Sequence, residues 1–202
     1  MMRTVPIKVV LLGDGRVGKT SLVLRYVNAT FSEQQTPTIQ ASYLTKRLNF
    51  NGAMVTLAIW DTAGQERFHA LGPIYYRDAD AALLVYDITD KDSFDRVKSW
   101  VKELRKMAPK DIILAIAGNK CDMNSQVDLK DSERYAASIG SSHFNTSAKS
   151  NIGIEETFLD IARRVLEQKK ALAENVPAST QRKTMVIIDE PPPPPPPSKC
   201  CS

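Results

Sequence analysis

The sequence is poor in the features that mark secreted, membrane-spanning and fibrous proteins. Only three cysteines occur among 202 residues, and two of them, Cys200 and Cys201, are adjacent, which excludes a disulfide scaffold. No apolar run approaches the roughly 18 residues that a membrane span requires. The first residues lack the apolar stretch and cleavage site of a signal peptide, and there is no internal repeat. We therefore expect a cytosolic domain with reduced thiols.

Charge of one sign is also scarce, since the net charge is only +4. Residues 171–202 hold three basic and three acidic side chains, so the whole excess lies in residues 1–170. It forms no basic stripe interleaved with aromatic residues, which argues against nucleic-acid binding. Periodic apolar spacing fades from Ala171, and seven consecutive prolines follow at 191–197. The sequence predicts one folded domain over 1–170 and a flexible tail over 171–202.

Apolar runs alternate with segments of helical spacing along the first 170 residues. The runs at 9–12, 82–86 and 112–117 are continuously apolar, as in strands that are buried on both faces. Asn51 and Gly52 separate two β-rich runs and form a hairpin signal. This pattern predicts an α/β fold, a mostly parallel sheet with one antiparallel strand and helices between the strands. The helical spacing is carried by Phe94, Val97, Val101 and Leu104, and by Ile154, Phe158, Ile161 and Val165.

A phosphate-binding motif follows the first apolar run. Residues 13–20 read G-x-x-x-x-G-K-T, between a predicted strand and a predicted helix. The glycines allow backbone N–H groups to surround a phosphate, Lys19 supplies a positive charge, and the Thr20 hydroxyl can ligate Mg²⁺. Arg16 is either an extra phosphate contact or, as we prefer, a solvated side chain. The candidate phosphate-binding residues are Gly13, Asp14, Gly15, Arg16, Val17, Gly18, Lys19, Thr20 and Ser21.

A second motif selects the base. Residues 119–122 read N-K-C-D directly after an apolar strand. The Asp122 carboxylate accepts hydrogen bonds only, so it fits the N1–H and amine of guanine and rejects adenine. The Lys120 stem can lie along the base. Residues 146–149 (T-S-A-K) form a loop whose backbone N–H groups can meet the guanine O6. Cys121 beside the base is either a redox-sensitive thiol or, as we prefer, a small buried residue.

A third group of residues suits reaction at the γ-phosphate. Asp61 ends a predicted strand and can hold Mg²⁺ through water. Gly64 allows the backbone to approach the γ-phosphate, and Gln65 can orient an attacking water. Thr38 can bring a second hydroxyl to Mg²⁺. The predicted reaction converts GTP and water into GDP and phosphate, with Gln65, Lys19 and Thr38 as catalytic residues.

These five elements, in this order over residues 7–150, resemble the Ras-like small GTPases. Segments 39–43, 67–72, 75–78 and 84–89 are similar to signatures of the Rab branch, and within it to its endosomal group. The resemblance covers about residues 5–170. It implies a P-loop NTPase G domain with a six-stranded, mostly parallel sheet, one antiparallel strand and helices on both faces.

The resemblance also implies residue roles and partners. Phe31 would flank the guanine, and Asn119, Lys120, Asp122, Ser147, Ala148 and Lys149 would complete the base site. Tyr43, Trp60 and Tyr75 would form an aromatic patch for effectors, although packing alone explains part of the role of Trp60. A monomer with slow turnover would depend on an exchange factor and on an activating protein that supplies an arginine. No arginine is an obvious finger in cis, and Gly15 leaves room for one in trans.

The chain ends Lys-Cys-Cys-Ser, which does not fit the C-a-a-X rule. The Cys200–Cys201 pair resembles instead the doubly geranylgeranylated end of Rabs, which implies a Rab escort protein, a GDP dissociation inhibitor and the cytosolic face of endosomal or other endomembranes. Prolines 191–197 are a spacer or, less favoured, a ligand for an SH3 or WW domain. Residues 185–188 are equally an escort-protein contact or tail sequence without a partner. A nucleotide-holding scaffold that does not cycle is the alternative function; Gln65, Thr38 and Gly15 argue against it.

Overall fold

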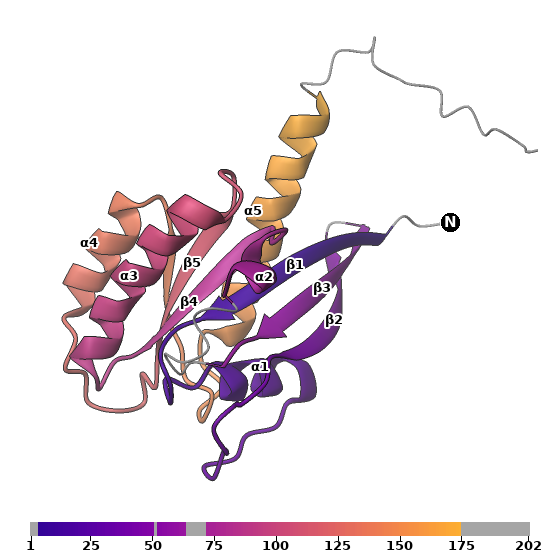
Figure 1. Cartoon of the computed structure of the whole chain (residues 1–202). Coiled ribbons are helices and arrows are strands. Elements are labelled where there is room, and N and C mark those ends of the chain that lie inside the picture. The colour runs from indigo at the N-terminus through magenta and orange to yellow at the C-terminus, as the bar shows by residue number, and fades with distance from the viewer. Residues whose placement is uncertain (1–3, 51, 64–71, 175–202) are drawn as a thin grey trace, which may run out of the picture.

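The computed structural model describes residues 4–50, 52–63 and 72–174 (Figure 1). A six-stranded sheet in the order β2-β3-β1-β4-β5-β6 forms its centre. The strands are β1 (Thr4–Leu12), β2 (Ser42–Phe50), β3 (Ala53–Asp61), β4 (Ala81–Asp87), β5 (Ile113–Asn119) and β6 (Ser142–Asn145). The described helices are α1 (Lys19–Asn28), α2 (Gly72–Tyr76), α3 (Lys91–Met107), α4 (Leu129–Ser138) and α5 (Ile154–Glu174).

The predicted sheet is confirmed, including its single antiparallel strand. β1 pairs in parallel with β3 and β4, β4 with β5, and β5 with β6, whereas β2 pairs antiparallel with β3. The β2–β3 hairpin forms where its turn signal was found, with Gly52 at φ +81°. Asn51 lies outside the described residues. α3 connects β4 to β5, and α4 connects β5 to β6. Helices cover both faces of the sheet, which explains why the apolar runs of β4 and β5 are continuous rather than alternating.

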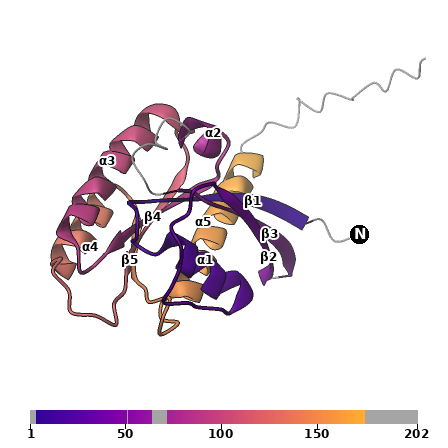
Figure 2. The ribbon, with the colours of Figure 1, turned by 60° about the horizontal axis from the view of Figure 1, so that its bottom comes forward.

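Two hydrophobic cores lie on opposite faces of the sheet. β1 shows the alternation, because Ile7, Val9 and Leu11 join one core and Val10 and Leu12 the other. The first core lies under α1 and α5, where Tyr26 stacks on Phe158 with ring centroids 4.0 Å apart. The second lies under α3 and α4 and includes the apolar faces of both helices. Figure 2 shows α1 and α5 on one side of the sheet and α3 and α4 on the other.

The end of the domain differs slightly from the sequence-based boundary. α5 continues to Glu174, past the predicted domain end at residue 170. Prolines 191–197 and the Cys200–Cys201 pair lie outside the described residues, so the tail stays a prediction. Among the described residues, no helix is long and apolar enough to cross a membrane.

The carboxyl ends of the parallel strands meet at one edge of the sheet, and the described parts of the nucleotide-binding motifs lie there. The P-loop follows β1, Asp61 ends β3, and Asn119 ends β5. α1 begins at Lys19, so its N-terminus points at the same edge. Binding sites of open α/β sheets form at this edge, where loops from several strands converge on one crevice.

Candidate nucleotide-binding site

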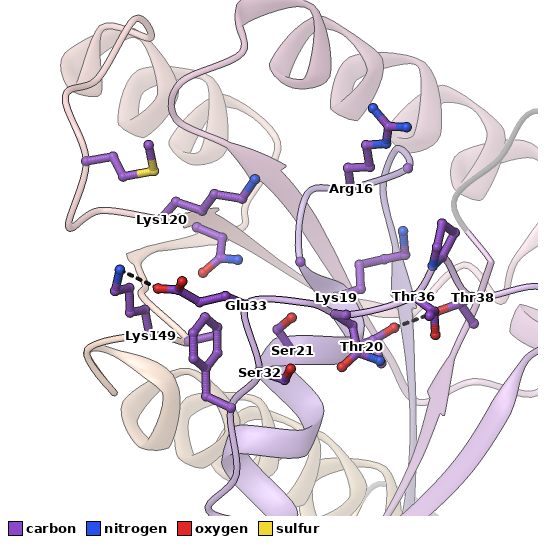
Figure 3. Close-up of a pocket in the computed structure, with 18 of the residues that line it drawn as sticks. Arg16, Lys19, Thr20, Ser21, Ser32, Glu33, Thr36, Thr38, Lys120 and Lys149 are labelled. Carbon is purple, nitrogen blue, oxygen red and sulfur yellow. Dashed lines mark hydrogen bonds and ion pairs between the residues drawn. The ribbon is translucent and has the colours of Figure 1, made fainter.

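A cavity of about 1010 Å³ opens at this edge of the sheet (Figure 3). Its walls come from five separate segments: the P-loop and start of α1, the loop at 31–38, Thr62 after β3, residues 119–123 at the end of β5, and residues 148–149. Polar and charged side chains dominate the lining, and Figure 3 shows Lys19 and Thr20 at one end and Lys149 at the other. The lining therefore offers a phosphate end at the P-loop and a base end at residues 119–123 and 148–149.

Two glycines of the P-loop have no room for a side chain. Gly13 has φ +144°, and a Cβ there would lie 2.1 Å from the Val85 carbonyl oxygen. Gly18 has φ +94°, and its Cβ would lie 2.4 Å from Asn119 Nδ2. Both positions need glycine for backbone conformation and for space. The loop can therefore wrap closely around an anion at the N-terminus of α1.

Lys19 is held inside this loop. Its Nζ donates hydrogen bonds to the carbonyl oxygens of Gly13 and Asp14, at 2.8 Å each. Burial lowers the pKa of Lys19 to about 8, although the charges of Asp61 and Asp14 oppose the shift. Because the nearby charges do not fully offset the cost of burial, the Lys19 ammonium gains strongly from a bound phosphate.

Three side-chain oxygens converge beside Lys19. The Thr20 hydroxyl donates to Asp61 Oδ2 at 2.6 Å, and Thr38 Oγ1 lies 2.7 Å from Thr20 Oγ1. Asp61 is fully buried, and its Oδ1 has no hydrogen-bond partner among the described residues. Burial raises the pKa of Asp61, while the Thr20 hydrogen bond and Lys19 oppose the rise. Hard oxygen ligands around an unsatisfied buried carboxylate fit a divalent cation such as Mg²⁺.

Hydrogen bonds of one side chain connect the base end to the phosphate end. Asn119 Nδ2 donates to the Val17 carbonyl at 2.9 Å, and the Thr146 hydroxyl donates to Asn119 Oδ1 at 3.3 Å. The Asn119 side chain thus joins the P-loop to the 146–149 loop. The Ser147 hydroxyl donates to Asp122 Oδ1 at 2.5 Å, which orients the carboxylate expected to read guanine. Sequence reasoning placed all of these residues at one site, and the structure brings them together.

The sequence analysis missed two residues that contact the 148–149 segment of the site. Arg25 donates to the carbonyl oxygens of Ala148 and Lys149, and its guanidinium lies 5.6 Å from the centre of the Phe31 ring. Glu33 forms an ion pair with Lys149 at 2.7 Å across the cavity mouth (Figure 3). This contact lowers the pKa of Glu33 and raises that of Lys149. Neither residue belongs to a local motif, so no sequence signal pointed to them.

Two open interpretations can be compared with the structure. Arg16 has φ +65°, and Figure 3 shows its side chain pointing away from Thr20, in line with a solvated role. Cys121 is partly buried and packs against the core under α3, and burial together with Asp122 raises the pKa of its thiol. A raised pKa disfavours the reactive thiolate, which agrees with a packing role.

The expected aromatic patch also forms. The rings of Tyr43 and Trp60 are 5.2 Å apart, and those of Trp60 and Tyr75 are 5.9 Å apart. Trp60 and Tyr75 pack partly against the core, whereas Tyr43 is 55% exposed. Ile39 and Ile74 are also strongly exposed. Exposed aromatic and apolar side chains of this kind are typical of a protein interface.

The whole arrangement agrees with comparisons to known proteins. The model of the Ras family matches residues 8–167. The chain belongs to the Ras family. Within that family it is similar to Rab proteins. It is 54% identical to "Ras-related protein Rab-21" of Bos taurus over 208 residues, which cover 99% of this chain and 94% of the relative. It is 51% identical to "Ras-related protein Rab-31" of Rattus norvegicus over 167 residues, which cover 82% of this chain and 86% of the relative.

The Rab resemblance stated from the motifs is confirmed by these matches. As a Rab GTPase, the protein binds GTP and GDP, hydrolyses GTP and regulates membrane traffic. Its family works through regulators and effectors. Gly64 and Gln65 lie outside the described residues, so their roles stay predictions.

Proposed function

We propose that Thr20, Thr38 and Asp61 form the Mg²⁺ site of this Rab GTPase. The observation that carries the proposal is the cluster of their oxygens. Thr20 Oγ1 lies 2.7 Å from Thr38 Oγ1 and 2.6 Å from Asp61 Oδ2, and Oδ1 of buried Asp61 has no hydrogen-bond partner among the described residues. When bound, Mg²⁺ neutralises charge on the β- and γ-phosphates. The two threonine hydroxyls would be direct ligands, and Asp61 would act through a bound water.

The remaining residues position the nucleotide. The P-loop N–H groups and Lys19 hold the phosphates, and the Lys19 ammonium stabilises charge that develops as the γ-phosphate leaves. Asp122 accepts from the guanine N1–H and amine, while Phe31 and the Lys120 stem flank the ring. Gln65 orients the attacking water. Because positioning and charge account for most of phosphoryl-transfer catalysis, slow intrinsic hydrolysis is expected without an activating protein.

Thr38 links the chemistry to recognition. Its hydrogen bond to Thr20 holds the 31–38 loop against the phosphate end of the cavity. Ile39 and Tyr43 follow directly in the chain, and Tyr43 contacts Trp60 of β3. Loss of the γ-phosphate would release Thr38 and change the order of this exposed surface. The aromatic patch is therefore the proposed effector surface.

The predicted tail supports a membrane-bound cycle. Two geranylgeranyl groups on Cys200 and Cys201 would give stable attachment, because one chain alone binds marginally and the tail offers no polybasic second signal. A Rab escort protein and a GDP dissociation inhibitor would handle the lipids, and the cytosolic face of endosomes is the proposed location. Fractionation of cells that express the Cys200→Ser/Cys201→Ser variant checks this, and persistent membrane association of that variant would refute the attachment.

Single-turnover hydrolysis of bound GTP tests the catalytic proposal. The parental protein should hydrolyse GTP in Mg²⁺ and respond to a cell extract that supplies activating protein, while Gln65→Leu should be slower in both conditions. Parental rates in Gln65→Leu would overturn the role of Gln65. A parental protein that binds GTP but never hydrolyses it, with or without extract, would favour the non-cycling scaffold instead.

A further inference from the structure

An ion pair between a buried carboxylate and a partly exposed lysine lies at the base end of the cavity. Asp87, the last residue of β4, is only 7% exposed. Its Oδ2 lies 2.5 Å from the Nζ of Lys120, whose side chain is 34% exposed. β4 and β5 are neighbours with Asp87 and Asn119 in register, which brings the two side chains to the same edge of the sheet. No motif in the sequence assigns a role to this carboxylate.

The Asp87 carboxylate is fixed from its other side. Its Oδ1 accepts hydrogen bonds from the Thr89 backbone N–H at 2.9 Å and from the Thr89 hydroxyl at 2.7 Å. The Asp87 backbone N–H donates to Ser93 Oγ at 3.0 Å, which ties the end of β4 to the first turn of α3. The carboxylate therefore has a defined position before any ligand arrives.

Lys120 is fixed less well by its own surroundings. Its backbone has φ +66°, a conformation that residues other than glycine adopt rarely. The neighbouring backbone is pinned, because the Ile88 N–H donates to the Asn119 carbonyl and the Cys121 N–H to the Thr146 carbonyl. Among the described residues, the ion pair with Asp87 is the one polar contact of the Lys120 ammonium. Without it, the flexible four-carbon stem would sample more rotamers.

We propose that Asp87 is a positioning residue for the bound base, acting through Lys120. The ion pair holds the lysine stem along the wall of the cavity, so that the stem is already ordered when guanine enters. Ordering a side chain before binding removes part of the entropic cost of association. This inference rests on the proposed base site and adds to it a residue that does not touch the nucleotide.

The first test is Asp87→Asn. An asparagine Oδ1 can still accept from Thr89, but its amide cannot pair with an ammonium, so only the ion pair is removed. We expect release of a fluorescent GDP analogue in Mg²⁺ to become about tenfold faster, equivalent to about 1.4 kcal/mol. The matched control is Asp90→Asn, three residues along the chain. Asp90 caps α3 by accepting from the N–H groups of Asp92 and Ser93, and asparagine caps equally well. Parental release is expected in this control.

A double-mutant cycle separates positioning from a merely structural role. Lys120→Met keeps an apolar side chain of similar length but removes the charge. Adding Asp87→Asn to Lys120→Met should accelerate GDP release no further, since the pair is already broken. Independent, additive effects of the two changes would overturn the proposal, as would parental release in Asp87→Asn.

Thermal unfolding supplies a second readout, in which the double variant is compared with Lys120→Met rather than with the parental protein. In Lys120→Met the Asp87 carboxylate is left buried without its cation, so the double variant should melt at a higher temperature than Lys120→Met. A lower melting temperature for the double variant would contradict the pairing. Failure of the parental protein to bind GDP would instead overturn the proposed base site, so the two failures are distinct.

Discussion

The shifted pKa of Lys19 predicts that nucleotide binding takes up a proton above neutral pH. Burial lowers this pKa from 10.5 to about 8, because the cost of desolvating the ammonium exceeds the opposing effect of the Asp61 and Asp14 charges. A bound polyphosphate requires the ammonium form, so GDP affinity should be constant near pH 7 and fall about tenfold per pH unit above pH 8. At pH 9 the loss is about 1.4 kcal/mol.

Stability of the nucleotide-free protein should change in the opposite direction. Between about pH 8 and pH 10.5 the folded protein binds fewer protons at Lys19 than the unfolded chain does. The free energy of unfolding therefore rises with pH across this window, as the cost of burying the ammonium is relieved. Opposite slopes for affinity and stability are a signature that general alkaline denaturation would not produce.

Isothermal titration calorimetry with GDP and saturating Mg²⁺ provides the assay. Titrations at about pH 7, 8 and 9 in two buffers of different ionisation enthalpy give both the affinity and the number of protons taken up. About half a proton per GDP is expected near pH 8. Lys149→Met is the control, because Lys149 is exposed, pairs with Glu33 and has a raised pKa. It should keep the parental slope. A flat affinity profile without proton uptake would refute the reasoning.

Three further predictions concern the P-loop, the cavity mouth and the core. Gly13→Ala should abolish nucleotide binding, because its Cβ would lie 2.1 Å from a backbone oxygen. Gly52→Ala, whose Cβ would meet nothing within 4 Å, should lower the free energy of unfolding in chemical denaturation by only about 1–2 kcal/mol, because of its positive φ. Glu33→Lys should accelerate GDP release, more at low salt than at high salt, and adding Lys149→Glu should restore it; release that ignores the second change would rule out the ion pair as the cause. Phe158→Ala should lower the free energy of unfolding by about 3–5 kcal/mol, measured in urea, and a loss below 1 kcal/mol would contradict its burial.

Local features of the fold could be predicted from the sequence because they depend on neighbouring residues. The apolar runs of β4 and β5 and the Asn51–Gly52 turn signal gave the strands and the hairpin, since pleat and turn geometry act over a few residues. The same holds for the P-loop. Gly13 and Gly18 allow a backbone that few other residues adopt, so a motif of eight residues indicates its conformation wherever it occurs.

The sequence also predicted that distant motifs share one site, because these motifs lie at or just after the ends of strands. Once Asp61 and Asn119 were placed at strand ends, a parallel sheet required them to share one edge. The chemistry of each group then followed from its type: an acceptor-only carboxylate for guanine and hydroxyl oxygens for a cation.

The sequence by itself determined the order of elements, the phosphate loop and the identity of the base, because these depend on short segments and on side-chain chemistry. Only the tertiary structure decided which distant residues support them. Arg25 reaches the Ala148 carbonyl across 123 positions of the chain, and Asp87 meets Lys120 because β4 and β5 lie side by side. Such contacts depend on how helices and strands pack, and burial then affects their strength. The carboxylate of the Asp87 pair is buried, whereas both side chains of the Glu33 pair are exposed and screened by water.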